Sequence, residues 1–199
     1  ITGIPVRYEM VEAVSQLKND STLESAHTFF TIPKGKPVVL ILGGGTGSQA
    51  LNTLVWNSLE ELTKVAYVFH ITGKGKIPLS LVEYASYQSH ECITKHLAVL
   101  FACAEIVITR AGMGVLSELC LLGKPSIIIP LLNSHQEQNA VFVEQAGAGR
   151  YCSQDTLTSE KFTQEILDLL SDSERKEKYS QNIKTLFPQN ATETIITII

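Results

Sequence analysis

A glycine-rich run, residues 43–50 (Gly-Gly-Gly-Thr-Gly-Ser-Gln-Ala), has the residue types best suited in this sequence to binding an anion. Glycines let backbone N–H groups approach a phosphate closely, and the positive end of a following helix adds a favourable dipole. The run follows five apolar residues, Val38–Leu42, which are typical of a strand buried on both faces of a parallel sheet. The sequence therefore predicts a phosphate-binding turn between this strand and a helix that starts near Gly47 or Ser48.

Residues 45–50 also satisfy the GxGxxA fingerprint of dinucleotide-binding domains. That fingerprint needs an acidic residue about 20 positions further on, where the carboxylate binds ribose hydroxyls. The sequence there is His-Ile-Thr-Gly-Lys-Gly-Lys (residues 70–76), which contains no carboxylate. A Walker-type loop is excluded too, because no Lys followed by Ser or Thr ends the glycine run. These absences disfavour NAD, and a purely structural tight turn is the remaining alternative to phosphate binding.

A second glycine-rich turn, residues 110–114 (Arg-Ala-Gly-Met-Gly), follows another predicted strand over residues 105–109. A helix is predicted over residues 115–122, so that the amides of residues 112–115 would face phosphate oxygens. The pattern places Glu118 in the first turn of this helix. Its carboxylate either accepts hydrogen bonds from a ribose diol or only complements the helix dipole, a stabilisation of about 0.3–1 kcal/mol.

A polar cluster, residues 133–140 (Asn-Ser-His-Gln-Glu-Gln-Asn-Ala), follows a third apolar stretch, residues 125–130. Its amide and imidazole groups are of the kind that read sugar hydroxyls. The alternative is an ordinary capping turn, in which Ser134 or Asn133 caps the next helix and Glu137 completes a capping box. Both interpretations stay open from the sequence.

The rest of the periodicity alternates between strand-like and helix-like segments. Further strands are predicted over residues 65–71 and 149–152, and helices over residues 97–103, 136–145 and 158–170, with two polar helical segments at the end. This alternation predicts a doubly wound α/β fold, in which helices cover both faces of a mostly parallel sheet. Ligands of such folds bind beyond the carboxyl ends of the strands, which is where the three polar loops would meet.

Composition fits a globular domain. Of 199 residues, 44% are hydrophobic, and the formal net charge of −4 gives no global attraction to nucleic acid. No apolar run reaches the roughly 18–20 residues of a membrane span. The four cysteines lie far apart and lack metal-ligand spacing, so we expect buried free thiols.

The beginning of the chain differs from the rest. Residues 1–7 (Ile-Thr-Gly-Ile-Pro-Val-Arg) have the Pro and Gly content of an extended connector, which we expect to follow a further N-terminal domain. A lead-in with helical spacing comes next, at Met10, Val11, Val14 and Leu17. The expected organisation is therefore a connector plus lead-in over residues 1–37 and a Rossmann-like nucleotide-sugar-binding domain over residues 38–199.

Four segments together resemble the C-terminal domain of the MurG family. They are residues 2–7 (Thr-Gly-x-Pro-Val-Arg), 43–52, 110–118 (Arg-x-Gly to Ser-Glu) and 135–140 (His-Gln-x-x-Asn-Ala). The resemblance covers essentially the whole chain. It implies the C-terminal half of a GT-B glycosyltransferase that moves N-acetylglucosamine from UDP-N-acetylglucosamine onto undecaprenyl-linked muramoyl-pentapeptide. Such an enzyme serves peptidoglycan synthesis, and hence cell shape and division, as a peripheral protein on the cytoplasmic face of the inner membrane.

The resemblance also implies which residues bind the donor. Arg7 and the turn of Gly45, Thr46 and Gly47 would lie at the diphosphate, and Ile93 beside the uracil. Glu118 would bind the ribose hydroxyls. Backbone contacts to the phosphates and nucleoside would come from Gly112, Met113, Gly114, Val115, Leu116 and Ser117. Gln136, with His135 and Asn139 nearby, would face the sugar.

The chain departs from the family pattern at one turn. The family commonly has Gly-Gly-Ser-Gln-Gly where this chain has Gly-Gly-Thr-Gly (residues 44–47), which displaces the hydroxyl by one position. For residues 8–31 the resemblance supplies no function.

An inverting sugar transfer needs a base for the acceptor hydroxyl and positive groups that stabilise the departing diphosphate. Helix N-termini and Arg7 would supply the positive groups, and the sequence has no DxD motif, so we expect donor binding without a metal or cofactor. The base and the lipid-acceptor groove would belong to the N-terminal domain, and this chain alone should not catalyse transfer. Three alternatives stay open. The first is the donor domain of another GT-B enzyme, either a glycolipid synthase or a dolichol-linked N-acetylglucosamine transferase subunit. The second is a nucleotide-sugar epimerase, which the scarcity of Asp residues disfavours, and the third is a non-catalytic nucleotide-sugar-binding module.

Overall fold

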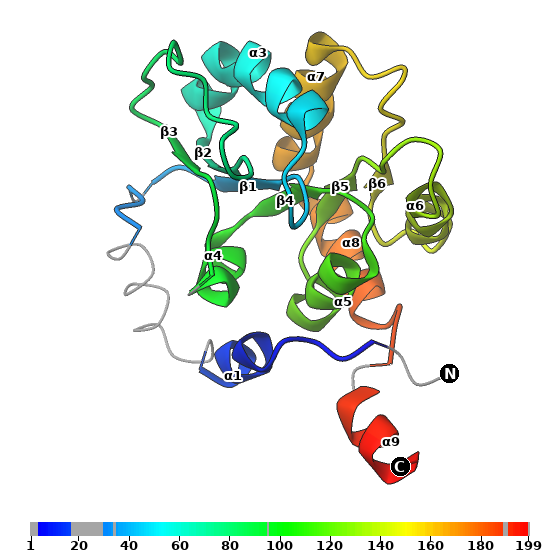
Figure 1. Cartoon of the computed structure of the whole chain (residues 1–199). Helices are drawn as coiled ribbons and strands as arrows, with labels where there is room; N and C mark the ends of the chain where they lie inside the picture. Colours follow the sequence, from blue (N-terminus) through cyan, green and yellow to red (C-terminus); the bar gives the residue numbers. More distant parts are fainter. Residues whose placement is uncertain (1–3, 17–29, 34, 95, 189–190, 199) are drawn as a thin grey trace.

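The computed structural model describes residues 4–16, 30–33, 35–94, 96–188 and 191–198. Thr2 and Gly3 of the predicted connector and Leu17 of the predicted lead-in lie outside these residues. The described chain contains one six-stranded sheet in which every neighbouring pair is parallel (Figure 1). Helices lie on both faces of this sheet, which confirms the doubly wound α/β fold predicted from the alternation of elements.

The strand order is β3-β2-β1-β4-β5-β6, the order of a Rossmann fold. The strands are β1 (Val38–Leu42), β2 (Tyr67–Ile71), β3 (Tyr87–His90), β4 (Ile106–Thr109), β5 (Ser126–Ile128) and β6 (Arg150–Tyr151). The chain moves outward from β1 in one direction through β2 and β3, and then returns to the other side of β1 with β4. The point at which the direction reverses lies between β1 and β4, and ligands of open α/β sheets bind beyond the carboxyl ends of the strands there.

The register brings the ends of the central strands level. Leu42, the last residue of β1, pairs with Ile71 of β2 and with Thr109 of β4. Each residue of β1 and β4 is buried, because these strands carry apolar side chains toward helices on both faces. The loops after β1, β2 and β4 therefore begin at one edge of the sheet, as the sequence predicts.

Eight helices are found in the described residues. They are α1 (Tyr8–Gln16), α3 (Gln49–Val65), α4 (Leu97–Cys103), α5 (Met113–Leu122), α6 (Gln136–Gln145), α7 (Ser159–Ser171), α8 (Ser173–Lys184) and α9 (Ala191–Ile198). Figure 1 shows α3 and α7 on one face of the sheet and α4, α5 and α8 on the other, with α1 beneath α4 and α5. The side chains of β1 divide accordingly: Val39 and Ile41 pack with α3 and α7, and Leu40 packs with α4 and α5.

Several details differ from the sequence predictions. The edge strand β3 was not predicted, because its sequence, Tyr-Gln-Ser-His, is polar and every residue is only half-buried. Val65 is the last residue of α3 rather than the first of a strand, since the helix continues until the amide of Ala66 bonds to the Leu62 carbonyl. The last helix, α9, is rich in Thr and Ile and is not polar.

The cysteines are free thiols, as predicted, but not all of them are buried. Cys120 and Cys152 are buried, Cys103 is half-buried, and Cys92 is exposed, which corrects the expectation for that residue. In the part of the chain that the structure describes, no helix has both the length and the apolar character needed to span a bilayer.

Candidate functional site

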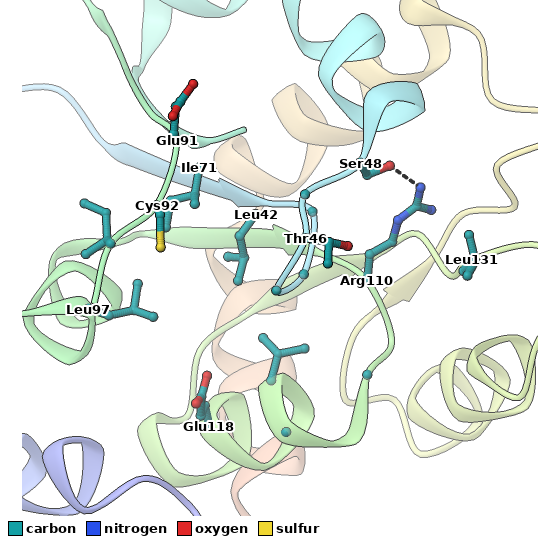
Figure 2. Close-up of a pocket in the computed structure, with 18 of the residues that line it drawn as sticks. Leu42, Thr46, Ser48, Ile71, Glu91, Cys92, Leu97, Arg110, Glu118 and Leu131 are labelled. Carbon is teal, nitrogen blue, oxygen red and sulfur yellow. Dashed lines mark hydrogen bonds between the residues drawn. The ribbon is translucent and has the colours of Figure 1, made fainter. Parts of the chain in front are cut away.

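A cavity of about 1160 Å³ opens at the carboxyl edge of the sheet, over the ends of β1 and β4. Its volume lies slightly above the roughly 300–1,000 Å³ of ordinary small-molecule sites. Figure 2 shows an apolar wall made by Leu42, Ile71 and Leu97 on one side of Thr46, and Arg110 with Ser48 on the other. One end of the cavity thus suits a flat apolar group, and the other suits a charged one.

The turn after β1 presents exposed backbone to this cavity. Residues 44–46 are exposed, and Gly44 and Gly47 have φ angles of +86° and +71°, in the left-handed region that favours glycine. The amide of Gly47 bonds to the Gly44 carbonyl at 3.1 Å, which closes the turn. Ser48 then caps α3 by accepting a hydrogen bond from the amide of Leu51 at 3.3 Å. The helix therefore starts where the sequence predicts, with its positive end at the turn.

The side chain of Arg110, the residue directly after β4, holds this region together. Its Nη1 donates to the carbonyls of Ile129 and Pro130, both at 2.9 Å. Its Nη2 donates to the hydroxyl of Ser48 and, at 2.6 Å, to Oε1 of Gln154. One guanidinium thus connects the turn after β1 with the segments that follow β5 and β6.

Arg110 is also a buried charge without an acidic partner. It is 5% exposed, and burial lowers its pKa. All four of its acceptors are neutral, and no ion pair in the described residues includes it. A buried positive charge behind Ser48, added to the positive end of α3, makes the turn attractive to an anion.

Glu118 projects from α5 toward the same cavity (Figure 2). It is 6% exposed and pairs with Arg7, whose Nε lies 2.7 Å and Nη2 2.5 Å from Oε1. Burial raises the pKa of the Glu118 carboxyl, and the charge of Arg7 opposes that rise. A buried carboxylate at a cavity wall is equipped to accept hydrogen bonds from hydroxyl groups.

The dipole interpretation of Glu118 is wrong. The helix α5 begins at Met113, with Gly112 as its N-cap, so Glu118 lies in the second turn and no acidic residue lies in the first. The helix begins earlier than predicted because the second glycine-rich turn is already part of it: Gly112 is the N-cap and Gly114 lies in the first turn. The start of α5 lines the cavity together with the turn after β1.

The polar cluster before α6 supports the second glycine-rich turn. Oε1 of Gln136 accepts hydrogen bonds from the amides of Ala111 and Leu131, both at 3.2 Å. Asn139 donates to the Ala111 carbonyl at 2.9 Å. The N-cap of α6 is His135, which makes no side-chain capping bond, so the predicted cap at Ser134 or Asn133 is wrong. The hydroxyl of Ser134 still accepts from the amide of Gln136, at 3.2 Å.

Most of the residues predicted to bind a donor do line the cavity. These are Arg7, Gly45, Thr46, Gly47, Ile93, Gly112, Gly114, Val115, Glu118 and Gln136. Five other predicted residues do not line it: Met113, Leu116, Ser117, His135 and Asn139. Of these, Leu116 is fully buried in the core, and Ser117 donates its hydroxyl to the Met113 carbonyl at 2.9 Å.

The structure adds residues that the sequence analysis did not select. Arg110, Ser48 and Gln154 form the support of the first turn, and Glu91, Cys92 and Thr94 line the cavity after β3. The position of Arg110, between a buried strand and a glycine-rich turn, is the signal that would have identified it. The residues after β3 gave no signal, because that strand is polar. Among the described residues there is no group of three or more His, Cys, Asp or Glu side chains placed to hold a metal.

Comparisons with known proteins show the family to which the chain is related. The sequence profile of the glycosyltransferase family 28 C-terminal domain matches residues 38–195. A protein of Christiangramia forsetii is 37% identical over 205 residues, covering 98% of this chain and 53% of that protein. It is described as UDP-N-acetylglucosamine--N-acetylmuramyl-(pentapeptide) pyrophosphoryl-undecaprenol N-acetylglucosamine transferase. The chain therefore spans about half the length of the curated relatives it matches.

Solved structures share the fold. The crystal structure of MurG from Acinetobacter baumannii matches with a TM-score of 0.71 and 24% identity, over 87% of this chain and 52% of that one. A UDP-GlcNAc 2-epimerase from Neisseria meningitidis, bound to UDP-GlcNAc, matches with a TM-score of 0.65 and 15% identity, over 94% of this chain and 50% of that one. At these identities the structural matches establish the arrangement of strands and helices only.

Proposed function

The chain belongs to the glycosyltransferase family 28 C-terminal domain family, and we propose that it binds the UDP-N-acetylglucosamine donor of a MurG-type N-acetylglucosamine transferase. The observation that carries this proposal is the convergence of two glycine-rich helix starts and the buried, unpaired charge of Arg110 on one cavity. We expect the positive potential of that arrangement to hold a diphosphate without a metal.

We assign each part of the donor to a part of the cavity. The diphosphate would lie against the backbone of residues 45–47 and the start of α5. Glu118 would accept hydrogen bonds from the ribose diol, and the apolar wall of Leu42, Ile71 and Leu97, together with Ile93, would take the uracil ring. Gln136 would face the sugar. Two backbone amides, those of Ala111 and Leu131, donate hydrogen bonds to its Oε1 and so fix its orientation.

The remaining parts of the reaction would lie in a longer protein. We propose that residues 38–199 form the donor domain and residues 1–37 a connector to an N-terminal domain that carries the base and the acceptor groove. In the reaction the positive ends of α3 and α5 would stabilise the charge that develops on the departing UDP. The acceptor would be the undecaprenyl-linked muramoyl-pentapeptide, reached at the cytoplasmic face of the membrane.

Calorimetric titration of the 199-residue chain tests the donor assignment. UDP-N-acetylglucosamine and UDP should both bind, UDP-glucose should bind more weakly because it lacks the acetamido group of the proposed donor, and NADH should not bind. Binding of NADH in preference to UDP would overturn the proposal. Equal affinity for the two UDP-sugars would instead indicate a donor domain of another GT-B enzyme.

A transfer assay separates the enzyme from a binding module. Joined to the N-terminal half of a relative, the chain should transfer N-acetylglucosamine to the lipid-linked acceptor, whereas the chain alone should not. Transfer by residues 1–199 without a partner would contradict the expected division of labour, and a hybrid that binds the donor but never transfers it would favour a non-catalytic module.

A further inference from the structure

A chain of buried and half-buried polar side chains runs from the surface of α3 to the edge of the candidate site. It consists of Trp56 and Asn52 on α3, His70 on β2 and Tyr87 on β3. His70 and Asn52 are both 0% exposed. Buried polar groups are costly unless they are fully hydrogen-bonded, so a connected set in the core needs an explanation.

The chemistry of the two ends fixes the direction of every hydrogen bond in this chain. The indole of Trp56 can only donate, and it donates to the hydroxyl of Tyr87 at 3.2 Å. The Tyr87 hydroxyl, which can accept and donate at the same time, lies 3.0 Å from Nδ1 of His70. Because the Thr72 carbonyl can only accept, Nδ2 of Asn52 faces it and Oδ1 of Asn52 accepts from Nε2 of His70 at 3.0 Å. The proton of neutral His70 is thus on Nε2, and Nδ1 accepts from Tyr87.

The last bond leaves the side chains and reaches the backbone. Nδ2 of Asn52 donates to the carbonyl of Thr72 at 3.0 Å, which is the orientation that an acceptor at Oδ1 requires. Four hydrogen bonds therefore run in one direction, from Trp56 to Thr72, and each acceptor is matched to a donor. Burial lowers the pKa of His70 to about 3, so the ring stays neutral and keeps this direction at physiological pH.

Thr72 is the residue against which the turn after β1 packs; this turn, residues 43–47, is called the phosphate turn. A Cβ atom on Gly47 would overlap the Thr72 carbonyl, and a Cβ on Gly73 would overlap the Thr46 carbonyl. Both glycines have positive φ, +71° and +95°, so the two turns fit together only as glycine backbone. Lys76 adds a further tie, since its ammonium donates to the Thr46 carbonyl at 2.8 Å.

We infer that the chain from Trp56 through Tyr87, His70 and Asn52 is a positioning device for the phosphate turn. By fixing the Thr72 carbonyl it fixes the surface on which Gly47 rests, and so the direction in which the amides of Gly45 and Thr46 point. His70 and Asn52 are positioning residues in this account, because neither lines the cavity. The inference rests on the proposed function, since it concerns how tightly the diphosphate of the donor is bound.

The test compares two ligands that differ only in the diphosphate. Asn52→Leu removes the last bond, and His70→Phe removes two bonds while keeping a ring in the core. Both variants should bind UDP about tenfold more weakly than the unaltered chain, while uridine affinity stays within about twofold, because the uracil wall is untouched. His70→Gln retains one acceptor and one donor and should recover part of the UDP affinity.

Asn57→Ala is the matched control. Asn57 is on the same helix but exposed, and its amide makes only a 3.4 Å contact with Ser159, so UDP binding should not change. Circular dichroism would show that each variant is folded. Folded Asn52 and His70 variants that bind UDP normally, or that lose UDP and uridine equally, would overturn the positioning role.

A measurement on the unaltered chain covers the case in which core variants do not fold. Nitrogen-15 NMR of the imidazole should find the proton of His70 on Nε2, with no change between about pH 8 and pH 5. A proton on Nδ1 would leave Nε2 without a proton to donate to Asn52, which would break the chain of bonds and overturn the inference. Tyr87→Phe, a change at a half-buried edge position, should weaken UDP binding in the same selective way.

If the unaltered chain fails to bind UDP, the proposed function fails as well. If the unaltered chain binds UDP normally and the variants bind it equally well, only the positioning role is contradicted.

Discussion

Arg7 and Glu118 are joined by an ion pair in which Nη2 of the guanidinium lies 2.5 Å from Oε1 of the carboxylate. The pair connects the segment before α1 with α5, although 111 positions separate the two residues in sequence. The Glu118 side chain is 8% exposed and the Arg7 side chain 50% exposed. Both bonds from Arg7 go to Oε1, which leaves Oε2 as the oxygen that would face a ribose diol. This contact brings the connector residue and the proposed ribose ligand into one site.

Replacing Glu118 with Ala should weaken UDP binding by about ten- to a hundredfold, because hydrogen bonds to a charged group contribute about 1.5–3 kcal/mol. Pyrophosphate binding should change much less, since pyrophosphate has no ribose. Calorimetry with the two ligands makes the comparison. Glu137→Ala removes an acid from the first turn of α6 and serves as the control. Equal losses for UDP and pyrophosphate would remove Glu118 from the ribose role.

Arg110 should contribute to both stability and donor binding. Arg110→Lys keeps the positive charge but not the four hydrogen bonds, so it should lower the free energy of unfolding by about 2–4 kcal/mol. Arg110→Met loses the charge as well, and should bind UDP more weakly than the Lys variant does. Urea denaturation and UDP titration of the two variants separate these effects. If both variants bind UDP equally well, the charge of Arg110 does not act on the ligand.

Gly47 should not tolerate a side chain. Gly47→Ala would force a methyl group against the Thr72 carbonyl at a φ of +71°, and should lower the free energy of unfolding by about 2–4 kcal/mol. Gly45→Ala is the matched control, because a Cβ there meets no atom within 4 Å. Urea denaturation of the two variants is the measurement. A Gly47 variant as stable as the Gly45 variant would show that the two turns can separate without cost.

Stability should fall in mild acid because of His70. Burial lowers the pKa of His70 to about 3, whereas in the unfolded chain it is about 6.5. Between these values the unfolded state binds the proton and the folded state does not. The free energy of unfolding is therefore complete above about pH 6.5 and decreases as the pH falls, by up to about 1.4 kcal/mol per pH unit.

Urea denaturation at several pH values between about 7.5 and 4.5 tests this dependence, with His70→Phe for comparison. The groups bonded to the ring, Tyr87 and Asn52, carry no negative charge that would favour its protonation. The Phe variant should be less stable at neutral pH but should lose less stability on acidification. Parallel curves for the two proteins would mean that other groups produce the acid sensitivity.

Donor binding should not require a metal. The positive groups at the cavity are Arg7, Arg110 and the helix starts of α3 and α5, and we expect these groups to balance the phosphate charge. The affinity for UDP-N-acetylglucosamine in EDTA should therefore stay within about twofold of that in millimolar Mg²⁺. A loss of tenfold or more in EDTA would contradict this expectation and indicate a metal bridge between protein and diphosphate.

Local sequence was sufficient for most of the fold. Five apolar residues in a row at Val38–Leu42 specify a strand buried on both faces, and the helix Gln136–Gln145 was predicted with its observed bounds because a polar turn precedes it and Gly147 follows. The two glycine-rich turns could be assigned to strand ends for the same reason. The edge strand Tyr87–His90 could not, since its half-buried position allows polar residues and removes the apolar pattern.

By itself, the sequence determined the alternation of elements, the glycine turns and the family resemblance, because these depend on residues that are neighbours along the chain. Tertiary structure alone decided which distant side chains meet. Glu118 faces Arg7, Arg110 reaches Ser48 and Gln154, and Asn52 connects His70 to Thr72. These contacts depend on strand order and register, which bring the ends of β1, β2 and β4 to one edge. No local pattern encodes that order, because it follows from how the helices pack on the two faces of the sheet.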